Sequence, residues 1–104
     1  ILHTDFDNNQ RIYLSYSKPK PDDDDYATTA VFSGILDNNA IINSKDIFVA
    51  EPYVNTNHHF GCRMIFDNDG FLFVAIGERG RRDDYPQKLD NHLENQLDNP
   101  LEIV

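Results

Sequence analysis

The segment 63–76 contains two short apolar runs separated by the sequence Asp67-Asn68-Asp69-Gly70. The flanking runs, residues 63–66 and 71–76, are rich in aromatic and branched side chains, which favour extended strands. Asn, Asp and Gly tolerate the positive φ angles of tight turns, so the whole segment predicts a β-hairpin. A hairpin holds its two ends close together, so the residues before 63 and after 76 are predicted to meet at one rim of a sheet.

The rest of the chain also shows mainly strand patterns. Alternating or branched apolar residues predict further strands at 11–17, 28–36, 40–42 and 46–49. Only residues 83–97 have a weak helical pattern, and it lacks a clear apolar stripe. The four consecutive aspartates at 22–25 repel one another and are predicted to form a solvated loop. These patterns predict an all-β fold with antiparallel strands.

A turn-like sequence recurs at intervals of 30 residues, at 6–9, 36–39 and 66–69. The outer copies also continue alike, because residues 12–14 resemble residues 72–74. The middle copy is equally well explained by the general preference for Asp and Asn in turns. Short strands, regular turns and a repeated unit are typical of radial β architectures such as propellers.

The length of 104 residues limits such an architecture. A four-stranded blade takes about 40–45 residues and a closed propeller needs about four to eight blades, so the chain supplies about two to two and a half blades and does not close on its own. We expect a single domain in which residues 1–56 form one blade lacking its start, 57–93 begin the next blade and 94–104 are a divergent tail. Exposed strand edges and apolar residues then predict a homo-oligomer, with a dimer as the expected state.

Composition argues against several classes of partner and site. The formal charge of −9, from 18 acidic and 9 basic residues, disfavours binding to nucleic acid or to an anionic membrane. No stretch approaches the roughly 18 apolar residues of a membrane span, and none resembles a signal peptide. A single cysteine, Cys62, excludes an internal disulfide and is expected to be a small buried residue.

Two residues that flank the hairpin, His59 and Glu78, are candidate catalytic groups. They lie just before the first strand and just after the second, so the hairpin lets them converge on one rim. A histidine beside a carboxylate suits general base catalysis, because the carboxylate fixes the tautomer and stabilises the imidazolium. On the residues alone, an ordinary structural role for His59 stays open. A metal site at His58 and His59 is disfavoured, because adjacent strand residues point to opposite faces.

Several separated segments resemble, in order, signature sequences of the soluble dehydrogenases that depend on pyrroloquinoline quinone (PQQ), the glucose/sorbosone dehydrogenase family. His59-Phe60-Gly61-x-Arg63 resembles the motif HFGGR, residues 66–74 resemble FDPDGYLFV, and Gly77-Glu78-Arg79-Gly80 resembles GDRG. Near the N-terminus, residues 2–6 and 12–17 resemble LHPDF and VYVSYS. The likeness covers about residues 1–93 and implies part of a six-bladed β-propeller.

The resemblance implies oxidation of an aldose at its anomeric carbon, with PQQ and Ca²⁺ as cofactors. It makes His59 the general base and Glu78 its supporting acid. The residues that it places on the substrate side are His58, Arg63, Arg81 and Arg82. Most quinone and calcium ligands of the family lie in other blades, so no cofactor or metal ligand is assigned here and the isolated chain is expected to be inactive. A periplasmic or secreted location is also implied.

The sequence departs from the family pattern at a few positions. His58 stands where relatives often carry Asp or Asn, Cys62 replaces a small residue, and residues 94–97 break the pattern that usually leads into another strand. An alternative function is therefore a small, self-associating β protein or a carbohydrate-binding module without catalysis.

Overall fold

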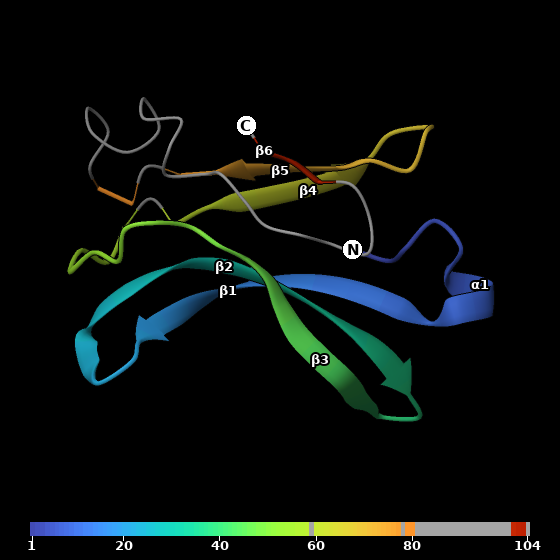
Figure 1. Ribbon diagram of the computed structural model, residues 1–104, viewed down its shortest axis with the longest axis horizontal. Coiled ribbons are helices and arrows are strands. Elements are labelled where there is room, and N and C mark those ends of the chain that lie inside the picture. Colours follow the sequence, from blue (N-terminus) through green and yellow to red (C-terminus); the bar gives the residue numbers. More distant parts are fainter. Residues whose placement is uncertain (59, 78, 81–100, 104) are drawn as a thin grey trace.

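The computed structural model describes residues 1–58, 60–77, 79–80 and 101–103. The chain forms two three-stranded sheets, which lie one above the other in Figure 1. The elements in chain order are α1 (Phe6–Asn9), β1 (Arg11–Lys20), β2 (Asp23–Asp37), β3 (Ala40–Val49), β4 (Cys62–Phe66), β5 (Leu72–Ile76) and β6 (Leu101–Ile103). The predicted helical segment 83–97 lies outside the described residues.

The first sheet has the order β1-β2-β3, with both neighbours antiparallel to the long central strand β2. Short turns make this meander, and each contains a residue with positive φ: Asp22 at 69° and Asn38 at 57°. Asp and Asn are among the residues that adopt this conformation at least cost. Strands β1 and β2 extend further toward the turn that joins them than the predicted strands 11–17 and 28–36, which form their central parts.

The aspartate run at 22–25 is the clearest correction in this sheet. It was predicted to be a solvated loop, but β2 begins at Asp23 and the turn is confined to Pro21 and Asp22. Asp23 lies opposite Lys20 in the β1–β2 ladder. The Asp23 carboxylate accepts the backbone N–H of Asp25 at 3.2 Å, and the Lys20 ammonium lies 5.4 Å from the centre of the Tyr26 ring. Asp24 and Asp25 remain exposed, so the run extends the ribbon without burying charge.

The second sheet has the order β4-β5-β6, and its β4–β5 pair confirms the predicted hairpin. In the turn, the Asp67 side chain accepts hydrogen bonds from the backbone N–H groups of Asp69 and Phe71, both at 2.9 Å. Gly70 adopts a φ of 90°, which only glycine reaches without strain. Unlike the other ladders, β6 pairs with β5 in parallel, and it lies within the predicted divergent tail.

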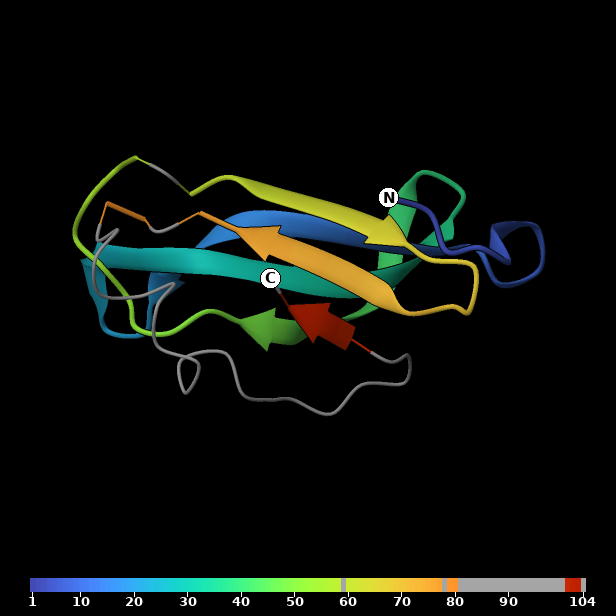
Figure 2. The same cartoon turned by 90° about the horizontal axis from the view of Figure 1, so that it is seen from above.

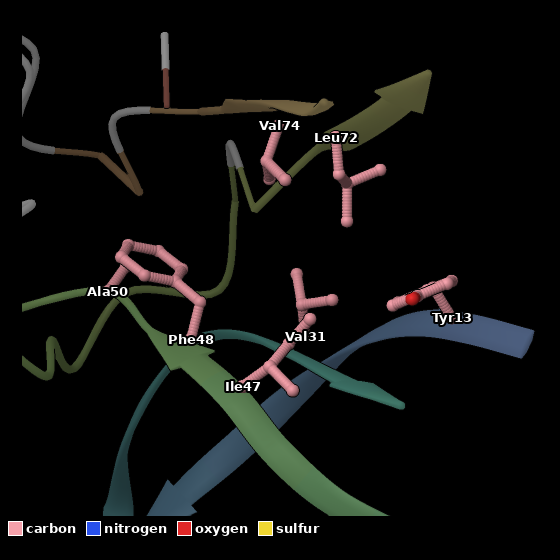
Figure 3. Close-up of a cluster of buried hydrophobic side chains, with 7 residues drawn as sticks. All are labelled: Tyr13, Val31, Ile47, Phe48, Ala50, Leu72 and Val74. Carbon is pink, nitrogen blue, oxygen red and sulfur yellow. The ribbon is translucent and has the colours of Figure 1, made fainter. Parts of the chain in front are cut away.

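The core lies between the two sheets. Figure 3 shows Leu72 and Val74 pointing from the second sheet toward Val31 and Phe48 of the first. Each of these side chains is at most 2% exposed, and burial of an aliphatic or aromatic side chain stabilises a fold by about 1.5–3 kcal/mol. Strand residues alternate between the two faces of a sheet, so every second residue of β4 and β5 faces away from the core. Ile65 of β4, for example, is 62% exposed.

Aromatic rings join the N-terminal segment to both sheets. The Tyr13 ring of β1 lies edge-on to Phe66 of β4, with centroids 5.4 Å apart, and the ring of His3 contacts both. The first turn-like repeat, predicted as a turn, forms the single helical turn α1 and ends at Gln10, whose φ is 55°. None of the helices among the described residues is long and apolar enough to cross a membrane.

The all-β fold class is confirmed, and the sheets remain open rather than closing on each other, as Figures 1 and 2 show. The division into blades at residues 56 and 57 stays a prediction. These two residues lie in the connection between β3 and β4, which links the two sheets.

Candidate functional site at the rim of the second sheet

The candidate site is the rim of the second sheet at which β4 begins and β5 ends. Cys62 and Ile76 form the last pair of the β4–β5 ladder, and the N–H of Gly77 donates to the carbonyl oxygen of Gly61 at 2.8 Å just beyond it. The residues immediately before β4 and after β5 therefore lie side by side. This is the convergence that the hairpin predicts for the segments carrying the two catalytic motifs.

Four of the predicted site residues, His59, Glu78, Arg81 and Arg82, lie outside the described residues. The separation of His59 from Glu78 therefore stays a prediction. Their neighbours Phe60 and Gly77, however, are described, and the Gly61–Gly77 hydrogen bond brings their two segments together.

The other two predicted residues, His58 and Arg63, lie near the same end of the sheet. His58 is exposed, and its Nε2 lies 3.1 Å from the position that a Cβ atom on Gly80 would occupy. The structure therefore brings His58 next to the segment that follows Glu78. Arg63 is an exposed residue of β4 opposite Ala75, on the face that points away from the core. The part of either residue in substrate binding stays a prediction.

Gly80 makes the closest backbone approach at the rim. Its φ is 82°, and a Cβ atom there would lie 2.9 Å from Oγ1 and 3.0 Å from Cγ2 of Thr56. The Thr56 hydroxyl donates to the carbonyl oxygen of Arg79 at 2.5 Å. A glycine is required here both by its backbone conformation and by lack of space, so the segment 79–80 is held tightly against Thr56.

Arg79 is the buried charge of the site. Its side chain is 1% exposed, and its guanidinium donates to the carbonyl oxygens of Gly77, at 3.1 Å, and Glu51, at 3.0 Å. A buried cation requires such acceptors, because its transfer from water is otherwise very costly. The arginine thus links the end of β5 to the β3–β4 connection. The sequence predicted no role for Arg79, and its place between Glu78 and Gly80 in the motif is the signal that could have indicated one.

Strand β2 holds the two ends of the β3–β4 connection through two buried threonines, for which the sequence predicted no role. The Thr29 hydroxyl donates to the carbonyl oxygen of Phe60 at 3.1 Å, and the Thr28 hydroxyl donates to that of Ala50 at 2.8 Å. Thr29 is 2% exposed and Thr28 is fully buried. The β3–β4 connection is therefore fastened to the first sheet at both ends. Threonine is common in strands, so its sequence position alone gives no signal of this function.

Cys62 lies half-buried between the sheets at the start of β4. Burial raises the pKa of the Cys62 thiol above its ordinary value, and a hydrogen bond with Ser15 opposes this effect only in part. A thiol with a raised pKa is protonated at neutral pH and is a poor nucleophile. The predicted buried position is thus met in part, since Cys62 packs against the core but is only half-buried.

The described residues do not fit a calcium site. Within residues 1–58, 60–77 and 79–80, no group of three or more His, Cys, Asp or Glu side chains could hold a metal ion. Asp67 and Asp69 belong to the hairpin turn, where the Asp67 carboxylate accepts backbone N–H groups. No step of the chemistry is therefore derived through a metal held by these residues.

Comparisons with known proteins agree with this architecture. The sequence profile of the Glucose / Sorbosone dehydrogenase family matches residues 1–97. The chain is 40% identical over 84 residues to the aldose sugar dehydrogenase YliI of Escherichia coli (strain K12), covering 79% of this chain and 22% of that protein. The crystal structure of the soluble aldose sugar dehydrogenase (Asd) from Escherichia coli, in the apo form, is similar with a TM-score of 0.75 and 38% identity, covering 86% of this chain and 26% of that one. A solved glucose dehydrogenase is similar with a TM-score of 0.71 and 35% identity, covering 78% of this chain and 24% of that one.

The chain spans about a quarter of the length of the relatives that it matches. Its two open sheets are a segment of the β-propeller of these sugar dehydrogenases, so the predicted partial propeller is confirmed. The family profile covers residues 1–97, which include all three strands of the first sheet and the β4–β5 hairpin of the second. This chain therefore belongs to the glucose/sorbosone dehydrogenase family.

Proposed function

We propose that the chain forms part of the catalytic rim of a quinone-dependent dehydrogenase that oxidises an aldose at its anomeric carbon. The observation that carries the proposal is the 2.8 Å hydrogen bond between Gly77 and Gly61. It joins the segment that contains His59 to the segment that contains Glu78, at a rim whose sequence motifs are those of sugar dehydrogenases.

In the proposed reaction, His59 accepts the proton of the anomeric hydroxyl while the hydrogen on the same carbon leaves with its electron pair. The Glu78 carboxylate orients the imidazole and stabilises its protonated form, as acid partners of histidine bases do. PQQ, held with Ca²⁺ by other parts of the protein, would supply the two-electron acceptor for this hydride. The sugar loses two hydrogens and becomes a lactone, so protons and electrons balance.

The sugar is the proposed small-molecule partner, and four residues are proposed to contact it: His58, Arg63, Arg81 and Arg82. The location of His58 supports its assignment, because this exposed side chain lies beside Gly80 at the rim. Imidazole and guanidinium groups donate hydrogen bonds that suit sugar hydroxyls. Since the described residues do not fit a calcium site, we propose that the calcium and quinone ligands come from other parts of the protein and that the isolated chain is inactive. We also propose that the protein is periplasmic or secreted, and that the isolated chain self-associates.

The test uses the full-length gene product loaded with PQQ and Ca²⁺, an aldose and a dye as electron acceptor. We expect His59→Asn to lower kcat/KM by about 10²–10⁴-fold, the usual contribution of a general base, and Glu78→Gln to lower it less. Glu51→Gln is the matched control for Glu78→Gln, because the Glu51 side chain is exposed and only its backbone carbonyl binds Arg79. Retained activity in His59→Asn would contradict the proposal, and sugar binding without turnover in the wild type would favour a non-catalytic carbohydrate-binding module.

A further inference from the structure

A buried hydroxyl group lies directly behind the segment that carries the proposed base. Thr29 is 2% exposed, and its Oγ1 donates to the carbonyl oxygen of Phe60 at 3.1 Å. Phe60 immediately follows His59 in the sequence. The next carbonyl, that of Gly61, accepts the N–H of Gly77. The carbonyl groups of Phe60 and Gly61 are therefore held from two directions, by the first sheet through Thr29 and by the second sheet through Gly77.

The strand that carries Thr29 is well suited to hold another segment in place. Thr29 pairs with Ser17 of β1 on one side, and on the other side its carbonyl oxygen accepts the N–H of Ala50 at 2.9 Å. A residue bonded on both sides in a central strand has little freedom to move. Beyond Ala50, the segment that leads to β4 contacts the first sheet through the isolated bridge between Val54 and Ala27 and then through the Thr29–Phe60 hydrogen bond. The hydrogen bond from Thr29 to Phe60 thus restricts the movement of the segment next to His59 relative to the first sheet.

We propose that Thr29 is a positioning residue for the general base His59, acting through the carbonyl group of Phe60 and without touching the sugar. This inference rests on the proposed function. Proton transfer requires the base within hydrogen-bond reach of the hydroxyl, and a misplacement of about 1 Å can cost as much as 10²-fold in rate. Loss of the Thr29 hydroxyl is therefore expected to affect kcat more than sugar binding.

Substitutions at Thr29 separate this role from packing. Thr29→Val keeps the shape of the side chain and removes the donor, whereas Thr29→Ser keeps the donor and removes a methyl group. Thr28→Val is the matched control, because Thr28 is equally buried on the same strand and its hydroxyl donates to Ala50, nine positions before His59. If Thr29→Val does not fold, Thr29→Ser and Thr29→Ala offer the same comparison, since these side chains differ by the hydroxyl group alone.

The experiment measures steady-state kinetics of these variants in the full-length gene product with PQQ, Ca²⁺ and an aldose, together with hydrogen exchange of peptides that cover residues 57–61. We expect Thr29→Val to lower kcat about ten-fold with KM changed less than about three-fold, and Thr29→Ser and Thr28→Val to stay within about two-fold of wild type. Exchange in residues 57–61 is expected to be faster in Thr29→Val than in Thr28→Val.

Three results, each with His59→Asn inactive, would overturn the inference alone. They are an equal loss of kcat in Thr28→Val and Thr29→Val, a greater loss in Thr29→Ser than in Thr29→Val, and wild-type kcat in Thr29→Val. Full activity in His59→Asn would instead overturn the proposed function, and the role of Thr29 would fall with it.

Discussion

The guanidinium of Arg79 reaches back 28 positions to the carbonyl oxygen of Glu51, with Nη2 and the oxygen 3.0 Å apart. The same side chain donates to Gly77 and is 1% exposed. Two segments that are distant in sequence, the end of β5 and the β3–β4 connection, are thus held by one buried cation. The rim of the second sheet depends on this contact for its shape.

Arg79→Met is expected to destabilise the 104-residue chain by about 2–3 kcal/mol, because hydrogen bonds to charged groups contribute about 1.5–3 kcal/mol and the carbonyl oxygens of Gly77 and Glu51 lose their donor. Urea denaturation followed by circular dichroism measures the change. Arg63→Met is the matched control and is expected to stay within about 0.5 kcal/mol of wild type, since Arg63 is exposed. Similar losses in both variants would contradict a special role for Arg79.

Gly80→Ala is expected to cost about 1–2 kcal/mol of stability, since a Cβ atom would lie 2.9 Å from Thr56 Oγ1 and the φ of 82° strains any side chain. Gly61→Ala provides the control at the same rim, because a Cβ atom there meets nothing within 4 Å. Thermal unfolding of the two variants distinguishes them. The prediction fails if Gly61→Ala is the more damaging substitution.

Stability is expected to fall as the pH rises above about 10, because burial and contacts with Asp46 favour the protonated forms of Tyr16 and Lys18 on the outward face of the first sheet. Burial, and then the hydrogen bond to Asp46, raises the pKa of Tyr16 from its ordinary 10.0, and the Asp46 carboxylate raises the pKa of Lys18 from 10.5. A group whose pKa is raised in the folded state contributes fully to the stability of the fold when the pH is below its pKa in the unfolded state. That contribution is lost as the pH rises through its pKa in the folded state. Asp46→Asn is expected to flatten this alkaline decline.

The check is the free energy of unfolding measured between about pH 8 and pH 12. Asp24→Asn serves as the control, because Asp24 is an exposed residue of β2. An unchanged alkaline decline in Asp46→Asn would show that the contacts of Asp46 with Tyr16 and Lys18 do not contribute.

The isolated chain is expected to be a dimer at near-physiological salt, because apolar residues on the outward faces, such as Ile65 at 62% exposure and Leu14 at 39%, lack cover in a chain of this length. Ile65→Lys is expected to shift the mass toward the monomer, whereas Asn68→Lys, with the same added charge in the nearby exposed turn, leaves it unchanged. Light scattering coupled to size-exclusion chromatography measures both. A monomeric wild type would contradict this prediction.

Local features of the fold were predictable from the sequence, because their causes lie within a few residues. The turn 67–70 and its flanking apolar runs specify the β4–β5 hairpin, whose observed ladder runs from Cys62–Ile76 to Phe66–Leu72. The aspartates at 23–25 lie in a strand and not in the predicted loop, because the β1–β2 ladder continues to the pair Lys20–Asp23 while Asp24 and Asp25 stay exposed. The partner of a strand residue depends on register, which the run of aspartates does not itself contain.

The supports of the candidate site were less predictable for a related reason. The convergence of the two motif segments follows from the hairpin, but the contacts of Arg79 with Glu51 and of Thr29 with Phe60 join residues 28 and 31 positions apart. Arginine is almost never fully buried, so composition argues against such a position for Arg79. These contacts depend on how the β3–β4 connection crosses between the sheets, which short-range patterns do not determine.

The contact between Tyr13 and Phe66 also gives this chain a built-in optical reporter. The sequence contains no tryptophan and 5 tyrosines. Tyr13 is 2% exposed between the rings of His3 and Phe66, whereas Tyr16, Tyr26 and Tyr53 are only partly covered. A ring fixed in asymmetric surroundings produces near-ultraviolet circular dichroism, and its loss there marks the loss of fixed tertiary packing. The part of the tyrosine signal that Tyr13→Phe removes therefore follows the contact between the two sheets, without an attached dye.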